Sequence, residues 1–345
     1  MIETAPESTR RVLVTGAGGF IGSHLTADQA CRGNEVVAVD LHLERIRHLE
    51  SPPLEFVEGD IADPQLQDRV VQGVDTVFHL AAAHLSVNTS ADEYRRVNVE
   101  AVRGLIEACD RAGVRRFVHC SSVGVFGRVE NPPANEQTPC RPEIPYEKTK
   151  LAGEEVVLDA HSARGFPATV LRPAWVYGPG CPRTEKLFRS IDRGRFVLGG
   201  RGDTLRHCLY IRDMIDAFNL AANSERALGQ VIIVGDEQAV SVSELVIEIA
   251  TLTGASPPRS VPLAPLYVAG LAAEIAFRLL RREPPLSRRS LKFFSGNSSF
   301  QIDRARDLLG FCPRFTLSSG LAETYRLFRC GSFWRVPLPD GASSE

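Results

Sequence analysis

A glycine-rich loop between a β-branched run and a helical stretch most constrains the fold of this chain. Gly16, Gly19 and Gly22 follow residues 11–15 and precede the helical stretch 23–32. In that position glycines let the pyrophosphate of a dinucleotide approach backbone N–H groups at the start of the helix. The loop therefore predicts a dinucleotide site at the end of the first strand of an α/β sheet.

The first 175 residues alternate short apolar runs with helical stretches. This rhythm is typical of a Rossmann-type, doubly wound parallel sheet. Strands are predicted at 11–15, 35–40, 54–58, 76–81, 117–121 and 168–171, and the clearest helices at 23–32, 95–112 and 146–163. After Pro173, turn clusters at 178–182 and 199–203 begin a less regular part, with a candidate extra strand at 231–234 and helices at 241–253 and 263–280.

These patterns divide the chain into two predicted parts. Residues 1–178, with return segments near 208–236, are expected to form the dinucleotide-binding Rossmann domain. Residues 179–207 and 237–335 are expected to form a smaller, C-terminal, substrate-binding lobe, and 336–345 a flexible tail.

Composition argues against several classes of partner. The 345 residues have a net charge of −2 and 24% charged residues, which give no basic surface for nucleic acid. Eight scattered cysteines are expected to be reduced thiols, and no metal site is predicted. The polar start of the chain lacks a signal-peptide pattern, so a cytoplasmic location is expected. The apolar stretch 261–280 is interrupted by Glu274 and Arg278, which favours a lobe helix over one on a membrane surface.

Carboxylates after the second and third predicted strands are candidate cofactor ligands. Asp40 would bind both hydroxyls of the adenosine ribose and repel a 2′-phosphate, which favours NAD over NADP, although it could instead cap the next helix. Asp60 could bind the adenine amino group or form a simple turn. Leu80, Ala81 and Ala82 end the fourth strand, where small residues permit close cofactor approach or serve only in packing.

A tyrosine and a lysine four residues apart form the candidate catalytic pair. Only four of the 40 basic residues are lysines, and one of them, Lys150, follows Tyr146 by four positions. Removing hydride from a secondary alcohol needs a base, and a phenol with a pKa of about 10 is a weak acceptor unless its anion is stabilised. Lys150 would supply that charge, and Ser122 would bind the substrate oxygen. The alternative for Tyr146 is an aromatic residue at the start of an amphipathic helix.

Seven segments, in order, resemble the extended short-chain dehydrogenase/reductases of the NAD-dependent epimerase/dehydratase kind. The segments are 15–22, 60–61, 79–82, 98–99, 121–127, 146–150 and 171–180. The resemblance implies NAD as cofactor, a small-molecule substrate held by the second lobe, and a homodimer formed through helices near Arg95 and Tyr146. The cofactor contacts expected from the motifs and the resemblance together are Gly16, Gly19, Phe20, Ile21, Gly22, Asp40, Asp60, Ile61, Leu80, Ala81, Ala82, Asn98, Tyr146, Lys150, Pro173 and Val176.

The sequence constrains the identity of the substrate less than it constrains the fold or the cofactor. Ser122 and Tyr146 are expected to contact it, and Arg206 lies in a stretch resembling the one that holds the phosphate in nucleotide-sugar members, or else is a surface ion-pair partner. Those members usually carry an acid next, where this chain has His207. The segments 284–300 and 305–311 resemble the tail of 3β-hydroxysteroid dehydrogenase-like relatives and of some sugar epimerases.

The expected reaction is NAD-dependent oxidation of a secondary hydroxyl, with a nucleotide sugar as first choice and epimerisation by re-reduction. Dehydratase members carry an acidic pair directly after the catalytic Ser or Thr, where this chain has Val123 and Gly124, so dehydration is not expected. A 3β-hydroxysteroid-like oxidation of a lipophilic alcohol is the alternative from the same chemistry. A catalytically idle NAD-sensing protein is the alternative from another class.

Overall fold

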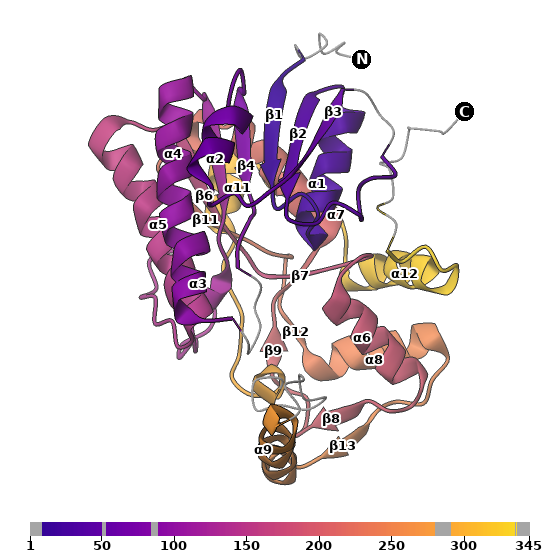
Figure 1. Ribbon diagram of the computed structural model, residues 1–345. Helices are drawn as coiled ribbons and strands as arrows, with labels where there is room; N and C mark the ends of the chain where they lie inside the picture. The colour runs from indigo at the N-terminus through magenta and orange to yellow at the C-terminus, as the bar shows by residue number, and fades with distance from the viewer. Residues whose placement is uncertain (1–8, 50–52, 84–88, 280–290, 335, 337–345) are drawn as a thin grey trace.

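A seven-stranded parallel sheet forms the centre of the molecule (Figure 1). The computed structural model describes residues 9–49, 53–83, 89–279, 291–334 and 336. The strand order is β11-β6-β5-β4-β1-β2-β3. The strands are β1 (Arg11–Thr15), β2 (Glu35–Asp40), β3 (Leu54–Glu58), β4 (Thr76–His79), β5 (Arg116–Cys120), β6 (Ala168–Pro173) and β11 (Val231–Val234). The predicted Rossmann-type fold is confirmed.

The strand order reverses at β1, which lies between β2 and β4. Thr15 pairs in register with Val39 on one side and with His79 on the other, so the three strands end at the same level. In open α/β sheets ligands bind outside the carboxyl ends of the strands at such a switch point. The fold therefore places the glycine-rich loop at the expected binding edge.

Helices cover both faces of the sheet and bury two separate cores. Val12 and Val14 of β1 pack into one core, whereas Leu13 packs into the other, as the alternation of side chains along a strand requires. Figure 1 shows one group of helices on each side of the sheet. The first core includes residues of α1 (Phe20–Cys31), α7 (Ile211–Asn223) and α11 (Asp303–Leu309), and the second includes residues of α2 (Pro64–Val70), α4 (Ala101–Ala112) and α5 (Pro145–Arg164).

The segment predicted as one helix over 95–112 is divided in the structure. The helix α3 (Ala91–Arg95) is followed by the π-helical turn Arg96–Glu100 and then by α4, which ends at Gly113 with a φ of 73°. Pattern analysis missed the turn because a single wide turn hardly changes the spacing of apolar residues. Its consequence is local, since it buries Asn98 beside the binding edge.

The remaining elements lie mainly beyond the carboxyl ends of the central strands (Figure 1). They include three two-stranded sheets that pair β7 (Trp175–Tyr177) with β10 (Cys208–Tyr210), β9 (Leu205–Arg206) with β12 (Val240–Ser241), and β8 (Val197–Gly199) with β13 (Arg259–Val261). The helices are α6 (Pro182–Asp192), α8 (Val242–Thr253), α9 (Leu263–Leu279) and α12 (Leu317–Arg329). Among the described helices, none has the length and apolar character needed to cross a bilayer. Of the predicted tail 336–345, only Val336 lies within the described residues.

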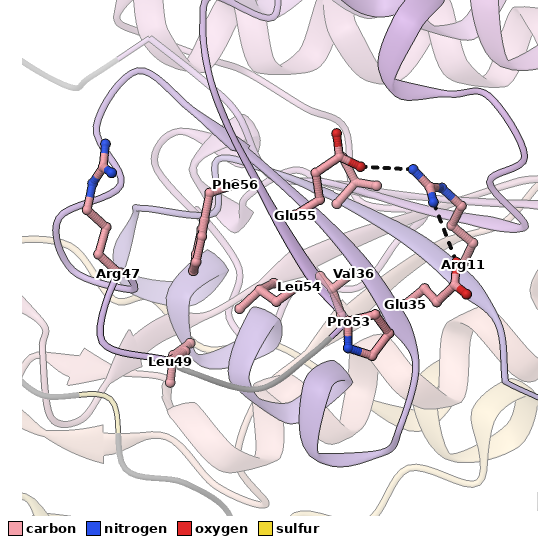
Figure 2. A pocket seen from close by; sticks show the side chains of 10 residues that line it. Arg11, Glu35, Val36, Arg47, Leu49, Pro53, Leu54, Glu55 and Phe56 are labelled. Carbon is pink, nitrogen blue, oxygen red and sulfur yellow. Dashed lines mark hydrogen bonds and ion pairs between the residues drawn. The ribbon is translucent and has the colours of Figure 1, made fainter.

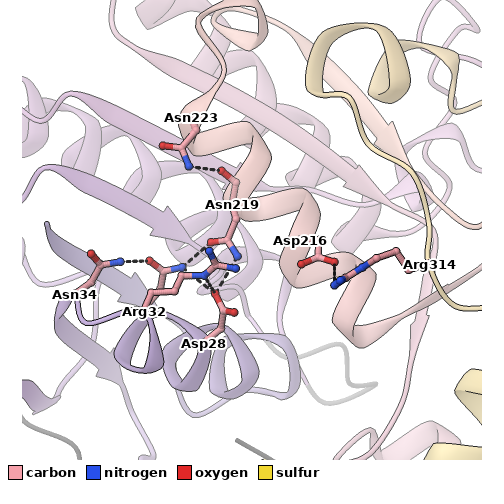
Figure 3. Close-up of polar contacts among 8 residues, drawn as sticks. Asp28, Arg32, Asn34, Asp216, Asn219, Asn223 and Arg314 are labelled. Atoms are coloured by element: carbon pink, nitrogen blue, oxygen red, sulfur yellow. Dashed lines mark hydrogen bonds and ion pairs between the residues drawn. The ribbon is translucent and has the colours of Figure 1, made fainter. Parts of the chain in front are cut away.

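A polar network joins α1 to α7 (Figure 3). The Asn219 side chain donates to Asp28 Oδ2 at 2.9 Å and accepts a hydrogen bond from Gln29 Nε2 at 2.6 Å. Arg32 Nε donates to the same Asp28 oxygen at 2.7 Å. These contacts anchor the helix that begins at the glycine-rich loop to a helix some 190 residues later in the chain.

Candidate active site

The glycine-rich loop is packed so closely that side chains cannot replace its hydrogens. Gly16 has a φ of 73°, and a Cβ there would lie 2.7 Å from the Ala81 nitrogen. A Cβ on Gly22 would lie 2.0 Å from the Gly16 oxygen. The helix α1 starts at Gly19 without a side-chain cap, so its first N–H groups, at Phe20 and Ile21, are not taken by a capping side chain. This arrangement fits the pyrophosphate of a dinucleotide.

The two candidate carboxylates lie at the ends of neighbouring strands and differ in their partners. Asp40 accepts hydrogen bonds from the Gly18 nitrogen at 2.9 Å and the His42 nitrogen at 3.1 Å, which places it beside the loop. Asp60 accepts from the Ala62 nitrogen at 2.9 Å and forms an ion pair of 2.8 Å with Arg96 from the π-helical turn. The Arg96 contact was not foreseen from the sequence.

The end of β4 closes the crevice beside the loop. The Leu80 nitrogen donates to the Thr15 oxygen at 3.1 Å, and the Ala81 nitrogen to Thr15 Oγ1 at 3.3 Å. Leu80, Ala81 and Ala82 are half-buried, whereas Ile61 is buried below them in the second core. Small side chains at this edge leave the backbone of β4 close to Gly16.

The three candidate catalytic residues gather at the end of β5 and the start of α5. Lys150 is 3% exposed, and its Nζ donates to the Cys120 oxygen at 2.6 Å. Tyr146, in the first turn of α5, also lies near Cys120 and packs its ring edge-on against Tyr94 at 6.0 Å. Ser122 follows Cys120 by two residues, and its Oγ accepts from the Gly124 nitrogen at 3.0 Å. The structure therefore brings the predicted set together.

Burial alone works against ionisation of the catalytic phenol. Removal of water raises the pKa of Tyr146 to about 12, with Arg183 opposing the rise. Burial also lowers the pKa of Lys150, although Cys120 and Glu154 oppose that change. Burial therefore disfavours the charged forms of both side chains in the protein without cofactor, and a phenolate at Tyr146 would need nearby positive charge.

Asn98 connects the π-helical turn to both sides of the site. Its Oδ1 accepts from the Ala83 nitrogen at 2.9 Å, and its Nδ2 donates to Thr149 Oγ1 at 3.0 Å. Pro173 ends β6, which neighbours β5, and Val176 lies in β7. Several predicted cofactor residues therefore end or directly follow strands of the central sheet, whereas Val176 belongs to the separate sheet of β7 and β10, and their contacts with a cofactor stay a prediction.

Arg206 lies apart from the catalytic set, in β9. It is buried, and its guanidinium donates to the carbonyl oxygens of Gly296 at 2.7 Å and Phe293 at 2.6 Å. His207 occupies the position after it because its ring bridges two backbone groups: Nε2 contacts the Asp236 oxygen at 2.7 Å, and Nδ1 accepts from the Phe300 nitrogen at 3.1 Å. In this structure Arg206 holds 293–296, and contact with a substrate phosphate stays a prediction.

A buried cluster beside the site was missed by sequence reasoning. Glu154 forms an ion pair with Arg172 at 2.6 Å and accepts a hydrogen bond from the Ser121 hydroxyl. Two histidines also stack next to Lys150, His79 on β4 and His119 on β5, with ring centroids 5.4 Å apart. The spacing of Glu154 four residues after Lys150 was the available signal, because it places both on one face of a helix.

One hollow in the structure lies away from the candidate catalytic residues. It measures about 530 Å³ and lies along the outer strands β2 and β3, between Arg11, Arg47 and Phe56 (Figure 2). Its lining includes Leu49 and Pro53, which flank residues outside the described part of the chain. None of the predicted site residues lines it.

Comparisons with known proteins show what the chain is similar to. Residues 12–235 match the sequence model of a family described as "NAD dependent epimerase/dehydratase family". The chain is 30% identical to dTDP-glucose 4,6-dehydratase of Streptomyces niveus, covering 97% of this chain and 98% of that protein. It is 31% identical to 3 beta-hydroxysteroid dehydrogenase/Delta 5-->4-isomerase of Mycobacterium tuberculosis, with coverage of 91% and 89%.

An epimerase and a solved structure are similarly related. UDP-glucose 4-epimerase of Mycolicibacterium smegmatis is 33% identical, covering 92% of this chain and 98% of that protein. The structure of MoeE5 in complex with UDP-glucose and NAD superposes with a TM-score of 0.73 at 32% identity, covering 93% of this chain and 99% of that one. The names of these relatives describe a dehydratase, a hydroxysteroid dehydrogenase/isomerase and an epimerase, so they do not agree on one reaction.

Proposed function

The chain belongs to the NAD dependent epimerase/dehydratase family, and we propose that it oxidises a secondary hydroxyl of a nucleotide sugar and re-reduces the ketone with epimerisation. Its cofactor is NAD, which supplies a hydride acceptor when bound. The observation that carries the proposal is the hydrogen bond of 2.6 Å from Lys150 Nζ to the oxygen of Cys120, the last residue of the strand that leads to Ser122; Lys150 lies four residues after Tyr146 on α5. Tyr146 takes the hydroxyl proton, Lys150 supports the phenolate, and Ser122 binds the substrate oxygen.

Epimerisation is favoured over dehydration by the surroundings of Ser122. Water elimination needs a further acid and base, whereas Val123 and Gly124 follow Ser122. The acid next to Tyr146, Glu147, accepts hydrogen bonds from the Glu143 nitrogen at 2.8 Å and the Ile144 nitrogen at 3.2 Å. This carboxylate caps the start of α5. The identity to a dehydratase leaves that activity open, so dTDP-glucose belongs among the test substrates.

The segments 179–207 and 237–335 are proposed as the substrate lobe, and the protein is proposed to act as a homodimer. UDP-sugars are the first choice of substrate because the related MoeE5 structure contains UDP-glucose with NAD. A lipophilic alcohol is the second candidate. It is favoured by the apolar helix α9, in which Val268 is 71% exposed and Leu271 43% exposed, and by the 3β-hydroxysteroid dehydrogenase relative.

One experiment separates these functions. The purified protein is denatured, released NAD(H) is measured, and the native protein is assayed with UDP-sugars, dTDP-glucose and 3β-hydroxysterols. An epimerase regenerates its cofactor each cycle, so we expect retained NAD(H) and interconversion of two UDP-sugar epimers without added cofactor. Net NADH formation with a sterol would overturn the sugar proposal in favour of the second candidate. NAD binding without turnover of any of these substrates would favour the idle binding protein. The Tyr146→Phe variant is the matched control for turnover.

A further inference from the structure

A buried ion pair lies one helical turn beyond the catalytic lysine. Lys150 and Glu154 are four residues apart on α5, and both are buried, with Glu154 only 1% exposed. Arg172 on β6 donates to both oxygens of Glu154, through Nε at 3.0 and 3.1 Å and through a terminal nitrogen at 2.6 Å. The Ser121 hydroxyl donates to the same carboxylate. Glu154 is therefore surrounded by donors from two strands.

Without Arg172, the natural partner of Glu154 would be Lys150. Oppositely charged residues four apart on a helix are neighbours, and their attraction is stronger in a buried site than in water. A Lys150–Glu154 pair would have no net charge. The ammonium would then stabilise the carboxylate instead of the developing phenolate of Tyr146.

We propose that Arg172 is a positioning residue for catalysis, which keeps Glu154 in an ion pair of its own so that Lys150 retains its charge for Tyr146. The inference rests on the proposed function, because it assigns to Lys150 the support of a phenolate. In the part of the chain that the structure describes, Lys150 forms no ion pair, and its Nζ donates a hydrogen bond to the neutral Cys120 carbonyl.

The other groups that face Lys150 carry no negative charge at neutral pH. His79 from β4 and His119 from β5 are buried, and burial followed by the charge of Lys150 lowers the pKa of both, that of His79 to about 3. The Cys120 thiol is buried, which raises its pKa to about 11. Glu154 is therefore the anion that matters to Lys150, and Arg172 is its counter-ion.

The test measures the pKa of Lys150 directly, in the protein without cofactor or substrate. The chain has only four lysines, so ¹⁵N-lysine NMR gives few side-chain signals, and Lys150→Met identifies the relevant one. In Arg172→Met an unpaired Glu154 should raise the pKa of Lys150 by about one unit, a tenfold change in its protonation ratio. In Glu154→Gln an unpaired Arg172 should lower the pKa of Lys150 by a similar amount. In the double variant the pKa of Lys150 should return close to its wild-type value.

Shifts of opposite sign in the pKa of Lys150 distinguish a positioning role of Arg172 from a purely structural one. A pair that only supports folding would reduce stability in both single variants and leave the pKa of Lys150 unmoved, which would overturn the proposal. If Arg172→Met does not fold, the proposal is tested with Glu154→Gln and the double variant. An unchanged or raised pKa of Lys150 in Glu154→Gln would then overturn it. Arg164→Met, which breaks an exposed 2.8 Å pair with Asp110 at the far end of α5, is the control and should give no shift.

Activity provides a second, separable measurement. With a working substrate, the acidic midpoint of kcat/KM should move up in Arg172→Met and down in Glu154→Gln, because the phenol pKa follows the charge left on Lys150. The NMR titration needs no turnover. Wild-type protein that turns over none of the test substrates would refute the proposed function, while the lysine shifts would still test the role of Arg172.

Discussion

Gly153→Ala tests how tightly the catalytic lysine depends on the packing of α5. Gly153 faces the π-helical turn three residues after Lys150, and an added Cβ would lie 2.4 Å from the Asn98 carbonyl oxygen. An ordinary contact begins at 3.4 Å, so helix and turn must separate by about 1 Å. Crowding of this kind costs about 1–3 kcal/mol, offset by about 1 kcal/mol because alanine favours helix over glycine.

The effect on turnover should exceed the effect on stability. Lys150 Nζ lies 2.6 Å from the Cys120 oxygen, and a displacement of about 1 Å in a catalytic group lowers the rate by about 100-fold. Urea unfolding should show a loss of about 1 kcal/mol, and kcat should fall by about 100-fold.

Gly104→Ala on α4 is the matched control for this substitution. Its Cβ would lie 2.5 Å from Gln67 Oε1, so the added methyl group causes similar crowding, but against a side chain of α2 instead of the backbone beside α5. We expect kcat to stay close to wild type in this variant. A kcat for Gly153→Ala within threefold of wild type would refute the reasoning.

Further substitutions test other parts of the site and fold. Tyr146→Phe should retain NAD but lose turnover by orders of magnitude. In the wild-type NAD complex, kcat/KM should rise with increasing pH, with a midpoint well below the pKa of about 12 that burial gives Tyr146 in the protein without cofactor. A midpoint near that pKa would contradict a role for the nicotinamide charge. Asp40→Ala should relax discrimination against NADP in binding titrations, and an unchanged preference would mean that Asp40 does not contact the ribose. Asn219→Ala should lower the free energy of unfolding by about 1–3 kcal/mol, because it removes the hydrogen-bond partner of Asp28 and Gln29 on α1. Asn223→Ala, at an exposed side chain, is the control. An equal loss of stability in both variants would contradict a special role for the Asn219 contacts.

The sequence predicted the sheet well because buried parallel strands are marked by local apolar runs. The strands 11–15, 35–40, 54–58 and 231–234 match the structure to the residue. The fourth strand was predicted to end two residues too late, because β4 ends at His79. The π-helical turn was not predicted, because one wide turn hardly changes the spacing of apolar residues along the segment.

The candidate site was predictable only where one short motif carried it. Tyr146 and Lys150 share a helix, and Ser122 follows the neighbouring strand, so spacing and strand order were sufficient. The Arg96–Asp60 and Arg172–Glu154 pairs join residues 36 and 18 positions apart through packing of different elements. Such contacts leave no local pattern, which is why Arg172 emerged only from the structure.

The stacked pair His79 and His119 makes the centre of the sheet sensitive to acid. Both imidazoles stay neutral when folded, with the pKa of His79 lowered to about 3, whereas in the unfolded chain they would accept protons at ordinary histidine values. Above a pH of about 6.5 both histidines are neutral in the folded and in the unfolded chain and favour neither state. As the pH falls below that value, the unfolded chain takes up protons that the folded chain does not, so folding is destabilised by up to about 1.4 kcal/mol per histidine and pH unit. Acidification would thus destabilise β4 and β5, the neighbouring strands on which His79 and His119 lie.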